Sequence, residues 1–242
     1  MNKPTAGKRL SVLFENDNVI AIDKQPGIIV IPDQHTPKAE TLVGLAELQA
    51  KSKLWVVHRI DRGTSGVLIF AKNEQAHAFI SQQFEKGLVK KTYWAIVSGR
   101  VEDDSGRIEV PISVDGRKVA LDGEGKPSVT DYKVVERFRD FTLVEANPGT
   151  GRRHQIRLHF MSLGYPLAVD NEYSSREALF LSEFKKKYKP AGIEKPLMAR
   201  LSLHSKSAVF SDRPIGEPLT IEAPLPDDFV VTIKQLRKYN RQ

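Results

Sequence analysis

The segment from Val57 to Gly66 is the most unusual stretch of the sequence, because it gathers reactive side chains in a loop-like, glycine-containing context. It reads Val-His-Arg-Ile-Asp-Arg-Gly-Thr-Ser-Gly. The carboxylate of Asp61 stands between two arginines, which favours its ionised form and a fixed direction. The hydroxyls of Thr64 and Ser65 can bond to nearby backbone and hold the loop. An ionised, oriented carboxylate suits covalent or proton-transfer chemistry, although the same cluster would also serve as a structural ion-pair turn.

Other kinds of reactive site are not expected. The sequence has no cysteine, which excludes disulfides, cysteine nucleophiles and thiolate metal sites. The spacings of four histidines match no zinc template, and we interpret them as structural hydrogen bonders, with a direct substrate contact as the less favoured alternative: His58, His154, His159 and His204. Residues 123–126 are not a phosphate-binding loop, since their glycine spacing is wrong and a proline follows the lysine. We therefore predict that the protein needs no metal and no cofactor.

The composition is that of a globular protein with an excess of positive charge. The chain has 242 residues, of which 40% are hydrophobic and 28% are charged. The formal net charge is +7 and the isoelectric point is about 9.5, which suggests nucleic acid. Basic residues cluster at 90–91, 152–153, 185–187 and 234–241. Charge alone would equally suit a solvated basic face, so the partner has to be identified from motifs.

Nothing in the sequence suggests a membrane. No apolar run approaches the length needed to cross a bilayer, and the first ten residues lack the hydrophobic stretch of a secretory signal. We expect a cytoplasmic protein without a membrane partner, and a monomer.

Short apolar strands alternate with amphipathic helices from Leu10 onward, after a tail at residues 1–9 that we expect to be flexible. Strands are predicted at residues 11–14, 19–23, 28–31, 66–71, 91–98, 129–138, 141–147, 201–210 and 219–223. Helices are predicted at residues 41–49, 74–86, 154–163 and 227–238, with Thr41 and Asn73 as caps of the first two. Because strands follow strands as often as helices do, we predict an α+β fold with a mixed, largely antiparallel sheet.

Two segments are predicted to be loops. Residues 116–130 are rich in Gly, Asp and Pro and should form an exposed loop between strands. Residues 180–196 are basic and lack clear periodicity. They would suit an insertion near an RNA surface, or equally a solvated lysine-rich loop.

The reactive segment resembles the signature loop of the RluA-type pseudouridine synthases, which is His-Arg-Leu-Asp, two variable residues, then Thr-Ser-Gly. Ile60 in place of leucine is the only change at a fixed position. Further motifs follow in the family's order: its Lys-x-Pro-Gly turn at 24–27, its Lys-x-Tyr-x-Ala strand at 91–95, its Gly-Arg-Thr-His-Gln-Ile-Arg-x-His segment at 151–159, and its Leu-x-Leu-His-Ala strand at 201–205. Arg153 replaces the usual threonine, which should alter helix capping, and Ser205 replaces alanine.

The resemblance covers roughly residues 10 to 225 and implies one pseudouridine synthase catalytic domain at 10–242, without the N-terminal S4 domain of some members. It implies an RNA isomerase that converts specific uridines of ribosomal or transfer RNA to pseudouridine. Asp61 matches the catalytic aspartate, Tyr93 the active-site tyrosine, and Arg157 the basic residue that pairs with the aspartate.

Four further residues are expected to contact the substrate. Arg59 matches an arginine implicated in holding or flipping the nucleotide. Leu203, or alternatively Leu201, would line the base pocket, although core packing explains either leucine equally well. His58 and Thr64, from the same loop as Arg59, complete the set. His154, Arg157 and Met161 have the spacing of one helical face, which could present Arg157 to the site.

Two other functions remain open at this point. A non-catalytic RNA-binding protein could keep the fold without the chemistry, and a nucleoside N-glycosylase could also use an aspartate and a flipped nucleotide. The products distinguish them, because the synthase releases the C5 hydrogen of uridine from an intact chain, whereas the glycosylase releases free base.

Overall fold

The computed structural model of the chain describes residues 9–33, 36–116 and 118–241. Residues 1–8, most of the predicted tail, lie outside the described residues. Residue contacts group the chain into two compact units. The first unit runs to Thr92 and adds Ser205–Pro224, and the second comprises Tyr93–His204 and the chain from Leu225 onward. No helix in the described part of the chain is long and apolar enough to span a membrane.

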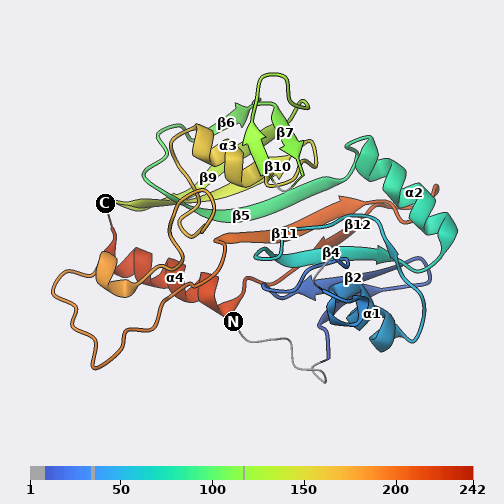
Figure 1. Cartoon of the computed structure of the whole chain (residues 1–242), viewed down its shortest axis with the longest axis horizontal. Coiled ribbons are helices and arrows are strands. Elements are labelled where there is room, and N and C mark those ends of the chain that lie inside the picture. The colour runs from blue at the N-terminus through green and yellow to red at the C-terminus, as the bar shows by residue number, and fades with distance from the viewer. Residues whose placement is uncertain (1–8, 34–35, 117, 242) are drawn as a thin grey trace. The chain divides into compact units, whose positions relative to one another are not determined.

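The first unit is a strand-rich body with two helices. Its strands are β1 (Val12–Glu15), β2 (Val19–Lys24), β3 (Trp55–Val56), β4 (Ser65–Ala71), the main part of β11 (Leu203–Phe210), and β12 (Leu219–Glu222). They follow the order β1-β2-β4-β11, with β3 on β4 and β12 on β11 (Figure 1). β4 is buried at every residue, and its alternate side chains enter one apolar cluster with α2 (Glu74–Glu85). The strand that follows the reactive loop is therefore fixed on both faces.

Both predicted helix caps of this unit are confirmed. The Thr41 hydroxyl accepts a hydrogen bond from Gly44 N–H at the start of α1 (Leu42–Ala50), which follows a 3-10 turn at Lys38–Glu40. The Asn73 side chain accepts one from Ala76 N–H at the start of α2. Each cap satisfies a backbone donor that the helix itself cannot.

The prediction of a strand at residues 28–31 is wrong. The carbonyls of Ile29 and Val30 instead accept hydrogen bonds from the backbone N–H groups of Leu42 and Val43, at 2.8 and 3.1 Å. These donors belong to the first turn of α1, whose backbone N–H groups have no acceptors within the helix. The segment therefore completes a helix end and not a sheet.

The second unit combines a four-stranded antiparallel order with a small hairpin. The order is β5 (Lys90–Ser98, from Tyr93 in this unit), β10 (Phe141–Pro148), β9 (Thr130–Arg137) and β6 (Ser105–Ile108). The hairpin pairs β7 (Ile112–Asp115) with β8 (Lys118–Leu121). The helices are α3 (Gln155–Ser162), the 3-10 turn Leu181–Glu183, and α4 (Asp227–Tyr239). The predicted α+β class with a mixed, largely antiparallel sheet is confirmed.

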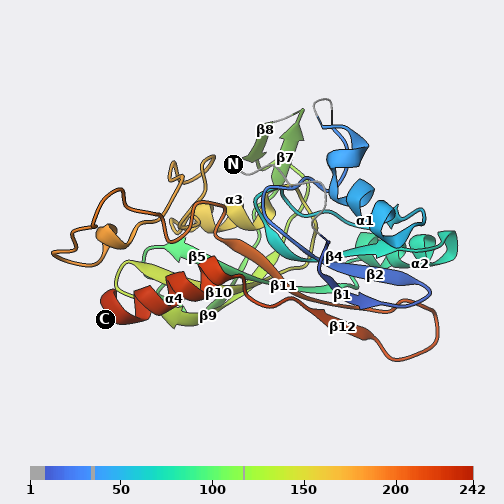
Figure 2. The same ribbon diagram turned by 90° about the horizontal axis from the view of Figure 1, so that it is seen from below.

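The loop predicted at residues 116–130 contains a strand. β8 occupies Lys118–Leu121 because it pairs with β7, and Ile112 also exchanges backbone hydrogen bonds with Lys126. Ile112 and Val119 pack with Leu158 of α3 in a small apolar cluster. Figures 1 and 2 both show β7 beside α3. The hairpin therefore covers the helix that carries Arg157.

Candidate active site

Asp61 lies in the turn that joins β3 to β4 of the first unit. The turn is closed by Thr64 N–H, which donates to the Asp61 carbonyl at 3.1 Å. Asp61 itself is half-buried, and the buried strand β4 begins one residue after Thr64. Asp61 thus lies in a closed turn just before a buried strand, a position that would suit an oriented catalytic group.

A buried lysine of the neighbouring strand holds this turn through hydrogen bonds. Lys24, the last residue of β2, has no exposed surface. Its Nζ donates hydrogen bonds to the carbonyls of Gln25, Arg62 and Thr64, at 3.1, 3.0 and 2.8 Å. A lysine is almost never fully buried unless its charge is satisfied, and here three carbonyls surround it. Two of those carbonyls belong to the turn that carries Asp61.

The turn at residues 24–27 makes two further hydrogen bonds to the same loop. Gly27 N–H donates to the Arg62 carbonyl at 2.7 Å, and Arg62 Nε donates to the Gly27 carbonyl at 2.8 Å. Gly27 has a φ of 91°, a conformation that glycine adopts without a steric penalty. The sequence shows a lysine and a glycine around a turn, and the structure shows that both hold the Asp61 loop.

The His58 ring forms a hydrogen bond with the backbone of β4. Its Nε2 accepts the N–H of Ile69 in β4 at 3.0 Å, and its ring stacks on Phe84 with centroids 4.5 Å apart. Burial, with the nearby charge of Lys91, lowers the pKa of His58 to about 3. The ring is therefore neutral at physiological pH, and its expected substrate contact stays a prediction.

The other two substrate-contact residues of this loop differ in exposure. Arg59 is exposed, and no ion pair or side-chain hydrogen bond joins it to any residue that the structure describes. Thr64 is only 1% exposed, and its hydroxyl has no hydrogen-bond partner among the described residues. Both side chains thus retain their full hydrogen-bonding capacity.

Arg157 lies on α3 in the second unit, where it forms a buried ion pair. Its Nε and Nη2 donate to the two carboxylate oxygens of Asp170, at 2.7 and 2.8 Å. Nη2 also donates to Glu172 at 2.9 Å, and the guanidinium lies 4.7 Å from the Tyr173 ring centroid. This bidentate geometry is the strong form of the Arg–carboxylate pair, and it fixes the guanidinium plane. Its pairing with Asp61, a residue of the first unit, stays a prediction.

Sequence reasoning missed Asp170, although an acidic residue directly after the apolar run 167–169 was a usable signal. Burial alone would raise the pKa of Asp170, but the hydrogen bonds and charge of Arg157 hold it below its usual value. The N–H groups of Glu172 and Tyr173 also donate to this carboxylate. Asp170 is therefore ionised and keeps Arg157 in place.

The side chains on the predicted face of α3 lie around one tyrosine. His154 Nδ1 lies 2.8 Å from the Tyr173 hydroxyl, and Arg157 lies over the same ring. Met161 and Tyr173 both pack against the cluster formed with the hairpin. Arg153 does not cap the helix, since its Nη1 donates to the Gly116 carbonyl at 3.2 Å.

Tyr93 and Leu203 are core positions of the second unit. Tyr93 is 9% exposed and lies opposite Ala146 of β10, whereas Leu203 is 4% exposed at the start of β11. The seven predicted site residues thus fall into two groups. His58, Arg59, Asp61 and Thr64 share one loop of the first unit, and Tyr93, Arg157 and Leu203 belong to the second.

Two solved human structures share this fold. The human RNA pseudouridylate synthase domain containing 4 superposes with a TM-score of 0.71 at 24% identity, covering 94% of this chain and 93% of that one. The human domain containing 1 gives 0.69 at 21% identity, covering 100% of both chains.

Sequence comparison goes beyond the fold. The family model described as RNA pseudouridylate synthase matches residues 18–162. An uncharacterised RNA pseudouridine synthase of Bacillus subtilis (strain 168) is 34% identical over 239 residues, which cover 95% of this chain and 73% of the relative. The ribosomal large subunit pseudouridine synthase C of Yersinia pestis is 35% identical, with 94% and 69% covered. Pseudouridine synthase D of Nitrosomonas europaea is 33% identical, with 94% and 65% covered. The chain therefore belongs to the RNA pseudouridylate synthase family of isomerases, as its RluA-type motifs predict.

Proposed function

We propose that this protein converts uridine in ribosomal RNA to pseudouridine, with Asp61 as the catalytic carboxylate. The observation that carries the proposal is the fastening of the Asp61 turn by Lys24 and Gly27, because catalysis requires a carboxylate held in one place. Ribosomal RNA is proposed as the substrate because the synthases C and D among the relatives act on the large ribosomal subunit by name.

The reaction is a rearrangement within one nucleotide. The N1–C1′ bond of uridine breaks, the uracil turns, and a C5–C1′ bond forms. C5 then loses its proton while N1 gains one, so the overall reaction needs no oxidant and no water. A carboxylate can promote bond cleavage either by attacking C1′ or by removing a proton from C2′. Asp61 is assigned this step.

The second unit supplies the remaining groups in this scheme. Tyr93 would stack on the uracil and take part in proton transfer from C5. Arg157 would help to aim the Asp61 carboxylate, and its rigid attachment to Asp170 supports a positioning role. Arg59, which is exposed on the Asp61 loop, would hold a phosphate or fill the space of the flipped base.

The test is tritium release from C5-labelled ribosomal RNA transcribed in vitro. We expect Asp61→Ala and Asp61→Asn to lose at least about 10⁴-fold in rate, or about 5 to 6 kcal/mol of transition-state stabilisation. RNA affinity should change little, since phosphate contacts elsewhere dominate it. Asp17→Asn is the matched control, because Asp17 is an exposed aspartate of the same unit.

The products separate this function from its alternatives. A synthase releases tritium and leaves the chain and its bases intact. Free uracil would identify an N-glycosylase, and RNA binding without either product would identify a non-catalytic binding protein. Wild-type turnover by folded Asp61→Ala protein would refute the assignment of Asp61. Labelled transfer RNA in parallel would show which RNA class is preferred.

A further inference from the structure

Two basic segments that are far apart in the sequence meet at Tyr239 in the second unit. Lys185 Nζ lies 4.7 Å from the Tyr239 ring centroid, and Lys238 Nζ lies 5.1 Å from it. Lys185 Nζ is also 4.8 Å from the ring of Tyr188. Figure 1 shows the segment around Lys185 beside the C-terminal end of α4. We call this region the C-terminal basic surface and define it by Lys185, Lys186, Lys187, Lys238, Tyr239 and Arg241.

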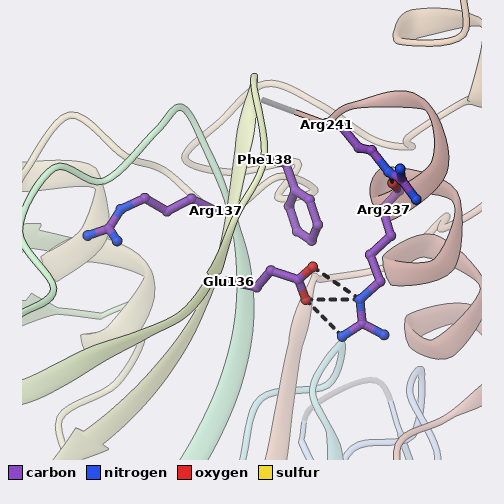
Figure 3. Close-up of a pocket in the computed structure, with 5 residues that line it drawn as sticks. All are labelled: Glu136, Arg137, Phe138, Arg237 and Arg241. Carbon is purple, nitrogen blue, oxygen red and sulfur yellow. Dashed lines mark hydrogen bonds and ion pairs between the residues drawn. The ribbon is translucent and has the colours of Figure 1, made fainter.

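Arg241 connects this surface to a hollow of about 310 Å³. The hollow is lined by Glu136, Arg137, Phe138, Arg237 and Arg241 (Figure 3). The guanidinium of Arg237 is held by Glu136 at 2.8 Å, so its charge is compensated. Arg241 instead uses Nε to bond the Arg237 carbonyl at 2.6 Å, and its terminal nitrogens have no partner among the described residues.

The positive charge of the surface is not balanced by the protein. Lysines 185, 186, 187 and 238 form no ion pair with any carboxylate in the described part of the chain. The nearby acids are occupied, since Glu183 pairs with Arg176 and Glu136 with Arg237. Hydrogen bonding from Lys238, with help from Lys185, lowers the pKa of Tyr239. Crowded like charges repel, so an anion bound among them would be stabilised.

We propose that the C-terminal basic surface, which contains none of the residues assigned to catalysis, binds the phosphate backbone of RNA. Lysines seated over aromatic rings have restricted positions, so binding a phosphate costs them less side-chain entropy. Such contacts carry no sequence information but fix how the RNA lies on the protein. The choice of RNA over another polyanion rests on the proposed function.

The experiment compares two triple variants with the same loss of charge. The surface variant is Lys185→Gln, Lys238→Gln and Arg241→Gln. The control is Lys51→Gln, Lys86→Gln and Lys133→Gln, which are exposed lysines outside the surface. Affinity is measured against salt, first with in vitro transcribed large-subunit ribosomal RNA and then with oligoadenylate, which contains no uridine.

The surface variant should bind both RNAs at least about tenfold more weakly, and its log–log salt slope should be smaller by about two units, at roughly 0.7 to 0.9 per lost contact. Its melting temperature and its single-turnover rate at saturating ribosomal RNA should equal those of the wild type, so only KM rises. The control variant should lose much less affinity and slope.

Several results would overturn the inference. A surface variant with the affinity and salt slope of the control would do so, as would unchanged RNA binding together with lost binding to phosphatidylserine vesicles. Oligoadenylate binding needs no isomerisation, so it separates the two proposals. A protein that binds through this surface but releases no tritium would sustain the inference while refuting the proposed function.

Discussion

At the scale of single residues, two charged side chains of the candidate site have hydrogen-bond partners that fix their positions. The ammonium of Lys24 is surrounded by three backbone carbonyls, and the guanidinium of Arg157 is bound edge-on by Asp170. Carbonyl dipoles and a buried carboxylate are fixed by the fold, so they orient a charge without the entropy cost of a mobile surface pair. In the proposed scheme, Lys24 and Asp170 would therefore position the residues that act on the nucleotide.

Lys24→Met tests this positioning role. The methionine fills a similar volume but removes the lysine donor from the carbonyls of Gln25 and Thr64, while the Arg62 carbonyl keeps the Gly27 N–H. We expect a cost of about 2 to 4 kcal/mol in unfolding free energy. The Asp61 turn would also lose its fastening, so kcat should fall at least about 100-fold while KM for RNA changes little. Urea unfolding and tritium release on the folded protein check both. Full kcat in a destabilised Lys24→Met protein would mean that Lys24 serves the fold alone.

His58 makes stability depend on pH. Its pKa is about 3 in the folded state and about 6.5 in the unfolded chain, so below pH 6.5 only the unfolded chain gains the proton. The contribution of His58 is complete above pH 6.5 and is lost as pH falls towards 3, at up to about 1.4 kcal/mol per pH unit. His58→Gln keeps an acceptor for Ile69 N–H but does not titrate. Its unfolding free energy, measured by urea between about pH 4.5 and 7, should fall less steeply than that of the wild type.

His58→Phe provides the matched control for that comparison. It also does not titrate, but it leaves Ile69 N–H without an acceptor, so it should be less stable at neutral pH by about 1 to 3 kcal/mol. Parallel pH curves for the wild type and His58→Gln would show that the ring is not buried as neutral imidazole.

The sequence singles out the candidate site residues more readily than it predicts their partners. Asp61 stands out because its neighbours in the chain are unusual, and adjacency is visible in one dimension. Asp170 lies 13 residues from Arg157, and the ring-stacking partner of His58 is Phe84 on another element. Such pairings follow from how helices and strands pack, which no local spacing encodes.

At the scale of elements, local signals succeeded and long-range pairings failed. Thr41 and Asn73 were identifiable as caps because capping depends on three or four consecutive residues. β8 was missed because its Gly- and Asp-rich surroundings suggest a loop, and it becomes a strand only by pairing with β7 and packing on α3. The strand prediction at residues 28–31 fails for the converse reason. Their composition is strand-like, but their carbonyls accept hydrogen bonds from the first turn of α1 and pair with no strand that the structure describes.

The contact between hairpin and helix can be tested through Leu158. It is 1% exposed and packs with Ile112 and Val119, so Leu158→Ala removes buried methyl groups and opens a cavity. We expect a loss of about 2 to 3 kcal/mol in unfolding free energy, towards the low end of such substitutions because the cluster is small. Leu163→Ala, at the exposed end of the same helix, should cost less than about 0.5 kcal/mol. Equal costs for the two would mean that the hairpin does not cover α3.

At the scale of the whole molecule, the reaction scheme uses only side chains, so removing metal ions should not affect it. We expect tritium release to continue at the wild-type rate after dialysis against EDTA, provided that the RNA is folded beforehand and its fold is verified. Loss of activity that zinc restores, with the RNA fold unchanged, would contradict a scheme based on Asp61, Tyr93 and Arg157. Restoration by magnesium together with recovery of the RNA fold would instead place the requirement in the substrate.

The net charge of +7 is also a property of the whole molecule, and it predicts how binding depends on salt. A protein that neutralises about six phosphates releases their counterions, so log Kd should change with log salt by about four to five units. That slope should be nearly the same for wild type and Asp61→Ala, because the carboxylate replaces no counterion and phosphate contacts do not depend on catalysis. Fluorescence anisotropy with large-subunit ribosomal RNA fragments over a range of potassium chloride concentrations measures it. A slope near zero would mean that the basic residues form only a solvated face, and affinity would then have to come from uncharged contacts with the target nucleotide.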